Sequence, residues 1–461
     1  MEKGEASPGI TFDKAMDRAV LWRLDTRILP ILALLFLCSF FDRTNVGNAR
    51  LYGLEKEIRV TDLQYDIGLS VYYATYIFSE IPSNLILKKV KPGVWLPCLA
   101  FFWGITAMST GFVKNFAQFT VVRAILGLCE GGLLPGMILY LSSIYNRSEL
   151  AIRIGIFYTS ASLSGAFSGL IARGIAQLDG RGGLSSWRWI FILFGLFSAS
   201  VGFISFWLLP NGIRTAKFLT PEQREYAIRR LQKPAKEEHF SWTEVGRGVF
   251  SVQTWLTALA YLGILSGLYS FGLFLPTIIE GLGYSADAAQ LWSVIPYAVA
   301  SFFTLCTAYL SDRLKVRGII MLFSLPIAIT GYAVIATTHN NSVKYGMTFL
   351  MATGLYASVP PVLGWLSNNS AGHYKRATTS ALQLAIANVG GFVAVFSYPA
   401  TDGPQYRQGH TIILSLLSVG WVLIFCNVLW CWKINKDKAN GKYDQYIGYG
   451  DDREPSFKLV L

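Results

Sequence analysis

The sequence predicts an all-α polytopic membrane protein, with twelve transmembrane helices in two pseudo-symmetric bundles of six. Of its 461 residues, 52% are hydrophobic and only 15% are charged, whereas a soluble domain carries about 25% charged residues. The apolar residues fall into separate runs of about 20, the length that crosses a bilayer as one helix. Six of these runs lie on each side of a polar central segment.

The predicted spans follow one another from residue 27 to residue 432. Their approximate bounds are 27–47, 65–87, 94–113, 117–140, 153–177, 188–209, 251–275, 290–311, 318–338, 345–366, 379–401 and 410–432. They divide the chain into an N-terminal tail (1–26), a first bundle (27–210), a middle loop (211–250), a second bundle (251–432) and a C-terminal tail (433–461).

Basic residues set the orientation of these spans. Of the 40 lysines and arginines, about 29 lie in the tails, the middle loop and alternate short loops on one side, against about 8 on the other; cytoplasmic loops are the ones enriched in them. Both tails are therefore expected in the cytoplasm. The net charge of +12 follows from this topology and does not indicate nucleic-acid binding, which would require a basic face on a soluble module.

Few residues are placed for covalent or metal chemistry. The four histidines are dispersed through connecting segments, and the six cysteines lie in or beside apolar runs without paired spacing, as buried apolar residues do. The chain has no Gly-x-Ser-x-Gly motif and no Gly-x-x-x-x-Gly-Lys-[Ser/Thr] phosphate loop. We therefore expect neither an enzyme nor an ATP-driven pump, and no cofactor or metal site.

A short basic loop occurs at the same place in each half. Residues 88–93 (Lys-Lys-Val-Lys-Pro-Gly) follow span 2, and residues 311–318 (Ser-Asp-Arg-Leu-Lys-Val-Arg-Gly) follow span 8. Any tight cytoplasmic turn is basic, but the matched position and final glycine favour a duplication, which places a binding site between the halves near mid-membrane. We expect Asp312 and Arg313 to latch neighbouring helices and to act in gating.

Over essentially its full length the chain resembles the major facilitator superfamily. Residues 311–318 resemble the signature cytoplasmic loop, although residues 88–93 lack its Asp-Arg, and residues 123–127 (Arg-Ala-Ile-Leu-Gly) resemble the span 4 motif. The finer resemblance is to the anion:cation symporters, in particular the fungal allantoate permease branch. The segments that carry it are 41–49 (Phe-Asp-Arg-Thr-Asn-Val-Gly-Asn-Ala), 80–84 (Glu-Ile-Pro-Ser-Asn) and 123–132. This resemblance implies plasma-membrane uptake of carboxylate nutrients and vitamins such as allantoate, nicotinate, pantothenate and biotin.

Four ionisable residues lie within spans 1 and 4, where each charge costs at least a few kcal/mol. Asp42 and Arg43 are neighbours on span 1 and point about 100° apart, so each needs another partner. Arg123 and Glu130 are seven residues apart on one face of span 4. The simplest neutral arrangement pairs Asp42 with Arg123 and Arg43 with Glu130.

Such pairs suggest a coupling mechanism. A proton on Asp42 or Glu130 would free its arginine to bind the carboxylate of a substrate, so that anion and proton move together. The resemblance implies the same roles for three of them: Asp42 and Glu130 as proton-coupling acids and Arg43 as the anion contact. Arg123 is predicted from its charge alone as a second substrate-binding residue. The alternative interpretation is a permanent ionic tie between helices.

Neutral side chains are the other candidates for substrate contact. Tyr72, Tyr76 and Glu80 form one stripe of span 2; the tyrosines fit a cavity wall or ordinary packing, and Glu80 fits a gate with a basic loop residue such as Lys88. The spans of the second half contain no Asp, Glu, Lys or Arg before Asp312, so they would contribute shape and neutral hydrogen bonds. The best candidates there are the amides of Gln383 and Asn388, which need partners inside a bilayer. The aromatic candidates, for each of which ordinary helix packing is the alternative, are Tyr269, Trp292, Tyr297, Tyr356 and Trp365. Trp365 is the one predicted to contact substrate.

The function predicted from the sequence is proton-coupled import of a small organic anion by alternating access, with protons and the bilayer as the other partners and the monomer as the functional unit. The nearest alternative is an exporter of a secondary metabolite. The absence of proline from residues 164–169 of span 5 argues against export. A sensor that binds a nutrient without transporting it is a remote alternative.

Overall fold

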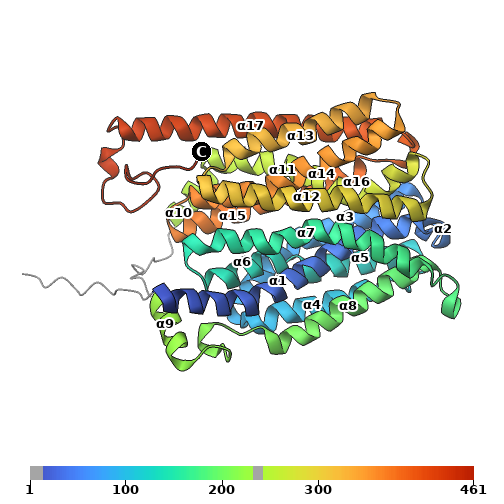
Figure 1. Cartoon of the computed structure of the whole chain (residues 1–461), viewed down its shortest axis with the longest axis horizontal. Coiled ribbons are helices and arrows are strands. Elements are labelled where there is room, and N and C mark those ends of the chain that lie inside the picture. Colours follow the sequence, from blue (N-terminus) through green and yellow to red (C-terminus); the bar gives the residue numbers. More distant parts are fainter. Residues whose placement is uncertain (1–13, 232–241) are drawn as a thin grey trace, which may run out of the picture.

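The computed structural model describes residues 14–231 and 242–461, and within these ranges the chain forms helices and no strands (Figure 1). The first half contains α1 (Lys14–Leu51), α2 (Leu54–Glu57), α3 (Asp62–Lys89), α4 (Pro92–Thr110), α5 (Phe116–Glu130), α6 (Leu133–Ser142), α7 (Arg147–Ala176) and α8 (Ser186–Leu208). The remainder contains α9 (Pro221–Leu231), α10 (Trp242–Val249), α11 (Val252–Gly281), α12 (Ala286–Leu314), α13 (Gly318–Thr337), α14 (Asn341–Asn368), α15 (His373–Asn388), α16 (Gly390–Phe396) and α17 (Arg407–Ala439). Short 3-10 helices occupy Arg181–Gly183, Ile213–Thr215, Ala400–Asp402 and Asp444–Tyr446.

Eleven helical segments of the described residues are long and apolar enough to cross a membrane, with α5–α6 and α15–α16 each counted as one segment. The remaining predicted span, the second, corresponds to α3, whose 28 residues are also long enough. The ends of the helices differ from the predicted spans. α1 begins at Lys14 and α17 continues to Ala439, because an apolar run marks where a helix enters lipid, whereas the helix itself continues into water.

The helices form two bundles that pack face to face. In Figure 1 the blue and green helices of the first half lie on one side, and the yellow and red helices of the second half lie on the other. Across this boundary α7 packs on α12, α1 on α11, and α3 on α16. The fold class predicted from the sequence is thereby confirmed.

Small residues bring helices close together at the crossings. On α7, a Cβ added at Gly165 would collide with the ring of Tyr297, and one added at Gly169 would meet Gln290, both on α12. These glycines therefore serve packing between the halves, as small residues do at helix crossings in membranes.

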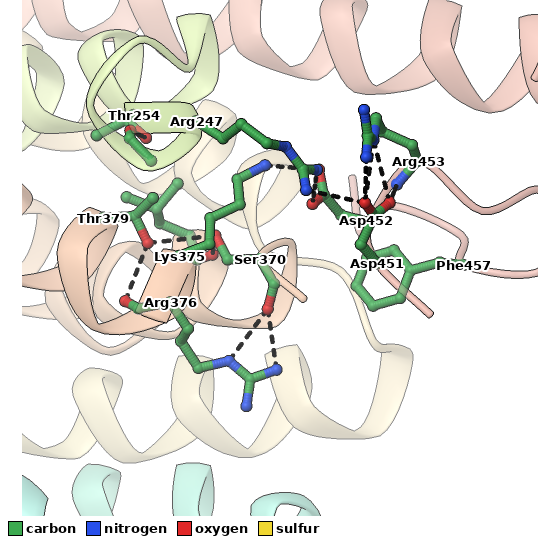
Figure 2. A network of polar contacts seen from close by, with 12 residues as sticks. Arg247, Thr254, Ser370, Lys375, Arg376, Thr379, Asp451, Asp452, Arg453 and Phe457 are labelled. Atoms are coloured by element: carbon green, nitrogen blue, oxygen red, sulfur yellow. Dashed lines mark hydrogen bonds and ion pairs between the residues drawn. The ribbon is translucent and has the colours of Figure 1, made fainter. Parts of the chain in front are cut away.

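The end of the molecule that holds Lys14 and the end of α17 is called the inner end here, following the predicted orientation. At this end the C-terminal segment turns back onto the second half. Figure 2 shows Asp452 between two cations: it accepts hydrogen bonds from Arg247 of α10 at 2.9 Å and from Lys375 of α15 at 2.6 Å. Asp451 also pairs with Arg247, at 2.8 Å. The tail is thus a packed element that joins α10 to α15.

Candidate functional site

Glu130 lies where span 4 is interrupted. It is the last residue of α5, and Gly131 and Gly132 separate it from α6. A Cβ on Gly131 would collide with the backbone carbonyl of Tyr76, and one on Gly132 with the hydroxyl of Ser83. Because neither glycine has a side chain, the interruption packs directly against α3, and this contact positions the Glu130 carboxylate.

The Glu130 carboxylate is fully buried and receives hydrogen bonds from two helices. Its Oε1 accepts from Arg43 Nε at 2.9 Å, from Arg43 Nη2 at 2.8 Å and from the Ser39 hydroxyl at 2.5 Å. Its Oε2 accepts from the Tyr72 hydroxyl at 2.7 Å. The predicted contact between Arg43 and Glu130 is present. Both hydrogen bonds from Arg43 join a cation to an anion and are therefore stronger than hydrogen bonds between neutral groups.

Arg43 also connects the first half to the second. Its Nη1 donates to the Tyr269 hydroxyl on α11 at 3.2 Å, and that hydroxyl donates to Asn388 Oδ1 on α15 at 2.9 Å. The Asn388 amide in turn donates to Glu80 of α3 at 3.5 Å. This chain of hydrogen bonds therefore runs from α1 across the interface and back to the first half.

A small cavity, with room for about one water molecule, lies between the halves beside Arg43. Both bundles contribute to its lining, which consists of Phe36, Phe40, Arg43, Tyr76, Leu134, Tyr158, Tyr261, Leu265, Tyr269, Leu384 and Asn388. Arg43 is the one charged side chain among these residues. Its guanidinium carbon lies 5.1 Å from the ring centre of Phe40 and 4.9 Å from that of Tyr76, within the range of cation–π attraction.

Asp42 and Arg123 lie inside the first bundle, away from this cavity, and each is only 2% exposed. The Arg123 guanidinium lies between the rings of Phe119 and Phe191, 5.5 and 5.8 Å from their centres. The described ion pairs do not include Asp42 with Arg123, so the predicted direct pairing is wrong for this structure. The physical reason is that the two rings hold Arg123, which acts on Asp42 through its charge and without contact.

Asp42 is nearly without hydrogen bonds. Neither of its carboxylate oxygens makes one of normal geometry, and the Trp103 indole and the Ser198 hydroxyl are its neutral neighbours. A buried carboxylate in this situation is costly when ionised. It is therefore chemically suited to hold a proton.

Comparison with known proteins places this arrangement in a family. The model of the Major Facilitator Superfamily matches residues 32–395. This chain belongs to the major facilitator superfamily. An uncharacterized transporter of Schizosaccharomyces pombe is 36% identical to it over 454 residues, which cover 96% of this chain and 90% of the relative. The high-affinity nicotinic acid transporter of Saccharomyces cerevisiae is 31% identical, over 96% of this chain and 85% of that protein.

Solved structures show the same fold. A bacterial homologue of the human lysosomal transporter Spinster, in an inward-facing and unoccupied conformation, matches with a TM-score of 0.66 and 16% identity. The match covers 90% of this chain and 98% of the other. Together with the family match and the transporter relatives, the fold makes this protein a multi-pass membrane transporter of the major facilitator superfamily.

The other predicted substrate contacts of this transporter lie at different places. Tyr76 and Asn388 line the cavity. Tyr72 is not part of the lining, and its hydroxyl donates to Glu130 instead. Gln383 donates to the Val362 carbonyl at 3.0 Å and so joins α15 to α14. Trp365 donates to the Val460 carbonyl at 2.8 Å. Trp365 is therefore at the inner end, against the C-terminal tail.

The three predicted gating residues, Glu80, Asp312 and Arg313, also lie at different places. Glu80 contacts Asn388 of the opposite half, and the side chain of Lys88, its predicted partner, lies outside the described residues. Asp312 forms an ion pair with Arg317, which also donates to Ser311 at 2.7 Å. Arg313 is exposed. Among the described residues, the ion pair of this loop therefore joins Asp312 to Arg317, and the gating role of Asp312 and Arg313 stays a prediction.

Sequence reasoning named Tyr269 as a candidate but missed Ser39, which donates to Glu130, and the lining residues Tyr261 and Leu265. Ser39 was not considered, although it lies one helical turn from Arg43 and on the same face. Tyr261 and Tyr269 are eight residues apart on α11, with Leu265 between them. That spacing puts all three on one stripe, a signal that could have identified this wall of the cavity.

Proposed function

We propose that this transporter imports a small organic anion together with protons, by alternating access between its two bundles. The observation that carries the proposal is that Arg43, the charged residue of the cavity lining, is held by Glu130. A substrate carboxylate and the Glu130 carboxylate compete for the same guanidinium. Binding of the substrate is therefore linked to the charge on Glu130.

A proton decides this competition. At about 3 Å and an effective dielectric of 20, an ion pair is worth on the order of 5 kcal/mol, so protonation of Glu130 weakens its hold on Arg43 considerably. One of the Ser39 and Tyr72 hydroxyls, which both donate to the ionised carboxylate, can then turn its hydrogen away and accept a hydrogen bond from the protonated acid. Arg43 turns toward the cavity and binds the anion.

Asp42 supplies a second site for a proton in this proposal. It is buried beside Arg123 without a direct ion pair, so its ionised form is poorly stabilised. Its protonation changes the charge inside the first bundle next to α1, the helix that carries Arg43. Asp42 is therefore assigned to coupling, and Arg123 to balancing its charge.

The contacts between the halves support a state that is closed at the outer end. The Tyr52 hydroxyl donates to Asp287 at 2.9 Å, and the backbone N–H of Ala400 donates to Asp62 at 2.8 Å. Both contacts join the first half to the second at the end opposite to Lys14. Substrate would be released from this state at the inner end, into the cytoplasm.

The name of the nicotinic acid transporter relative supports a vitamin or another carboxylate nutrient as the substrate. We place the protein in the plasma membrane, with both termini in the cytoplasm and one chain as the functional unit. The resemblance to carboxylate symporters and the distribution of basic residues are the grounds for this assignment.

Uptake by reconstituted protein tests the proposal. Labelled nicotinate and a panel of other vitamins, ureides and monocarboxylates are offered at about pH 5 and about pH 7.5, a range that covers protonation of buried carboxylates. We expect acid-stimulated accumulation of at least one anion. Glu130→Gln and Asp42→Asn should abolish accumulation driven by the proton gradient.

Exchange separates loss of coupling from loss of folding. A Glu130→Gln protein that still exchanges labelled for unlabelled substrate has lost coupling alone, and Glu225→Gln on the exposed face of α9 serves as the control. Wild-type uptake that ignores the proton gradient would refute coupling, and outward accumulation of the anion would identify an exporter.

A further inference from the structure

A second cleft lies beside the first turns of α1, at the inner end of the molecule. It shares no lining residue with the substrate cavity. Its volume is about 430 Å³, and it is lined by Trp22, Arg23, Thr26 and Arg27 of α1, together with Phe218 from the segment after α8. The four helix residues follow the spacing i, i+1, i+4, i+5. They therefore form one continuous stripe of the helix surface.

The acidic residues of this part of α1 are bound elsewhere. Asp17 pairs with Arg230 of α9 at 2.6 Å. Asp25 accepts two hydrogen bonds from Arg153 of α7, at 2.7 and 2.8 Å. These carboxylates are used to fix α1 to its neighbours, so they do not neutralise the cleft.

The two arginines of the cleft keep their charge available. Arg23 and Arg27 are exposed, and neither belongs to an ion pair among the described residues. Arg23 donates one hydrogen bond, from Nη1 to the Phe218 carbonyl at 3.2 Å, and this contact closes one side of the cleft. The cleft thus combines two exposed arginines, one helical turn apart, with two aromatic side chains.

The level of the cleft relative to the membrane follows from tryptophans. Trp22 is 70% exposed on α1, and Trp207 is 69% exposed at the inner end of α8. Exposed tryptophans of membrane proteins concentrate at the boundary between lipid and water. The first predicted span also starts at residue 27. The cleft therefore lies at the level of the lipid headgroups of the inner leaflet.

We propose that this cleft is a binding site for an anionic phospholipid of the inner leaflet. The phosphate lies between Arg23 and Arg27, because guanidinium groups bind phosphate oxygens in bidentate fashion. The rings of Trp22 and Phe218 contact the glycerol and the first methylene groups. The cytoplasmic leaflet is the anionic one and attracts basic residues next to a membrane. This inference does not depend on the transported substrate.

Lipid binding to the purified full-length protein tests the site. Native mass spectrometry measures binding of phosphatidylserine and phosphatidylinositol, with phosphatidylcholine as the neutral probe. Each basic residue near an anionic surface contributes about 1 kcal/mol, which is about fivefold in affinity. We expect Arg23→Gln with Arg27→Gln to weaken binding of the anionic lipids about thirtyfold and to leave binding of phosphatidylcholine unchanged.

A matched control removes the same charge from the opposite end. Arg59→Gln with Arg181→Gln replaces two exposed arginines that lie outside the cleft, and this variant should bind the lipids as the wild type does. Inorganic phosphate is added as a competitor, since the proposal requires the apolar part of the lipid and predicts little displacement. Unchanged lipid binding by the Arg23/Arg27 variant, or full displacement by inorganic phosphate, would overturn the proposal.

Discussion

Arg43 approaches one oxygen of Glu130 through two of its nitrogens, Nε at 2.9 Å and Nη2 at 2.8 Å. Its remaining terminal nitrogen donates to the Tyr269 hydroxyl at 3.2 Å. All three nitrogens of the guanidinium are therefore engaged in this state. An anion in the cavity can gain Arg43 only if Glu130 gives up part of its contact.

The first prediction concerns the shape of this cation. Arg43→Lys keeps the charge, but its single ammonium group cannot replace three nitrogens in a fixed plane. Loss of one hydrogen bond to a charged group costs about 1.5–3 kcal/mol, so we expect the apparent KM for the anion to rise by about tenfold or more. Initial uptake rates measure it. Arg181→Lys is the control, and an unchanged KM in Arg43→Lys would show that the guanidinium does not contact the substrate.

The second prediction concerns the interruption of span 4. Gly131→Ala places a methyl group against the backbone carbonyl of Tyr76, and overpacking of this kind costs about 1–3 kcal/mol. We expect a lower thermal stability and loss of uptake, since the same shift displaces Glu130. Gly174→Ala on α7 is a matched control because nothing lies within 4 Å of its added methyl group. Equal behaviour of the two variants would contradict the close packing described for Gly131.

The third prediction is a dependence of stability on pH at the outer end. Burial acts to raise the pKa of Glu57, but hydrogen bonds from Ser185, Trp187 and Arg188 outweigh it, so the pKa lies below its ordinary value of 4.5. A carboxylate with a lowered pKa stabilises the folded state above its ordinary pKa, and this stabilisation is lost as the pH falls through the lowered value.

Thermal unfolding at a series of pH values checks this prediction. Glu57→Gln should be less stable than the wild type at neutral pH, and the difference should shrink as the pH falls below about 4.5. Glu222→Gln on the exposed start of α9 is the control. A gap in stability that stays constant down to low pH would mean that the charge of Glu57 contributes nothing.

The fourth prediction concerns the C-terminal tail. Asp452→Asn removes the charge that attracts Arg247 and Lys375 (Figure 2). For these partly exposed pairs we expect a loss of about 1 kcal/mol and faster hydrogen exchange in α10 and in residues 451–460. Asp444→Asn, on an exposed part of the same tail, should exchange as the wild type does. Equally slow exchange in both variants would show that the tail is held by other contacts.

The fold could be predicted largely from the sequence, because the length of an apolar run and the position of basic residues are fixed by the membrane itself. The contact between Arg43 and Glu130 could also be predicted, since a buried charge requires a partner and span 4 supplied one. The same reasoning failed for Asp42 and Arg123. Charge balance does not show that the rings of Phe119 and Phe191 hold the arginine apart from the carboxylate.

The depth of a residue along its helix was the second feature that the sequence could not predict. Trp365 was chosen as an aromatic residue within a span, but it lies at the inner end and binds the Val460 carbonyl. Composition gives no register between helices, so it does not distinguish a residue at the cavity from one several turns away. The docking of the tail was also missed, because Asp451 and Asp452 look like ordinary acidic residues of a polar terminus.

Spans 4 and 11 are both interrupted at the level of the cavity, one after Glu130 and the other at Val389, directly after Asn388. Span 11 is thus divided into α15 on its inner side and α16, which packs on α3 and α11. α15 has 16 residues and is about 24 Å long, so a tilt of about 10° at Val389 moves its far end by about 4 Å. Lys375, which the tail binds through Asp452, lies near that far end. A displacement of the tail there would turn α15 about Val389 and so change the orientation of Asn388.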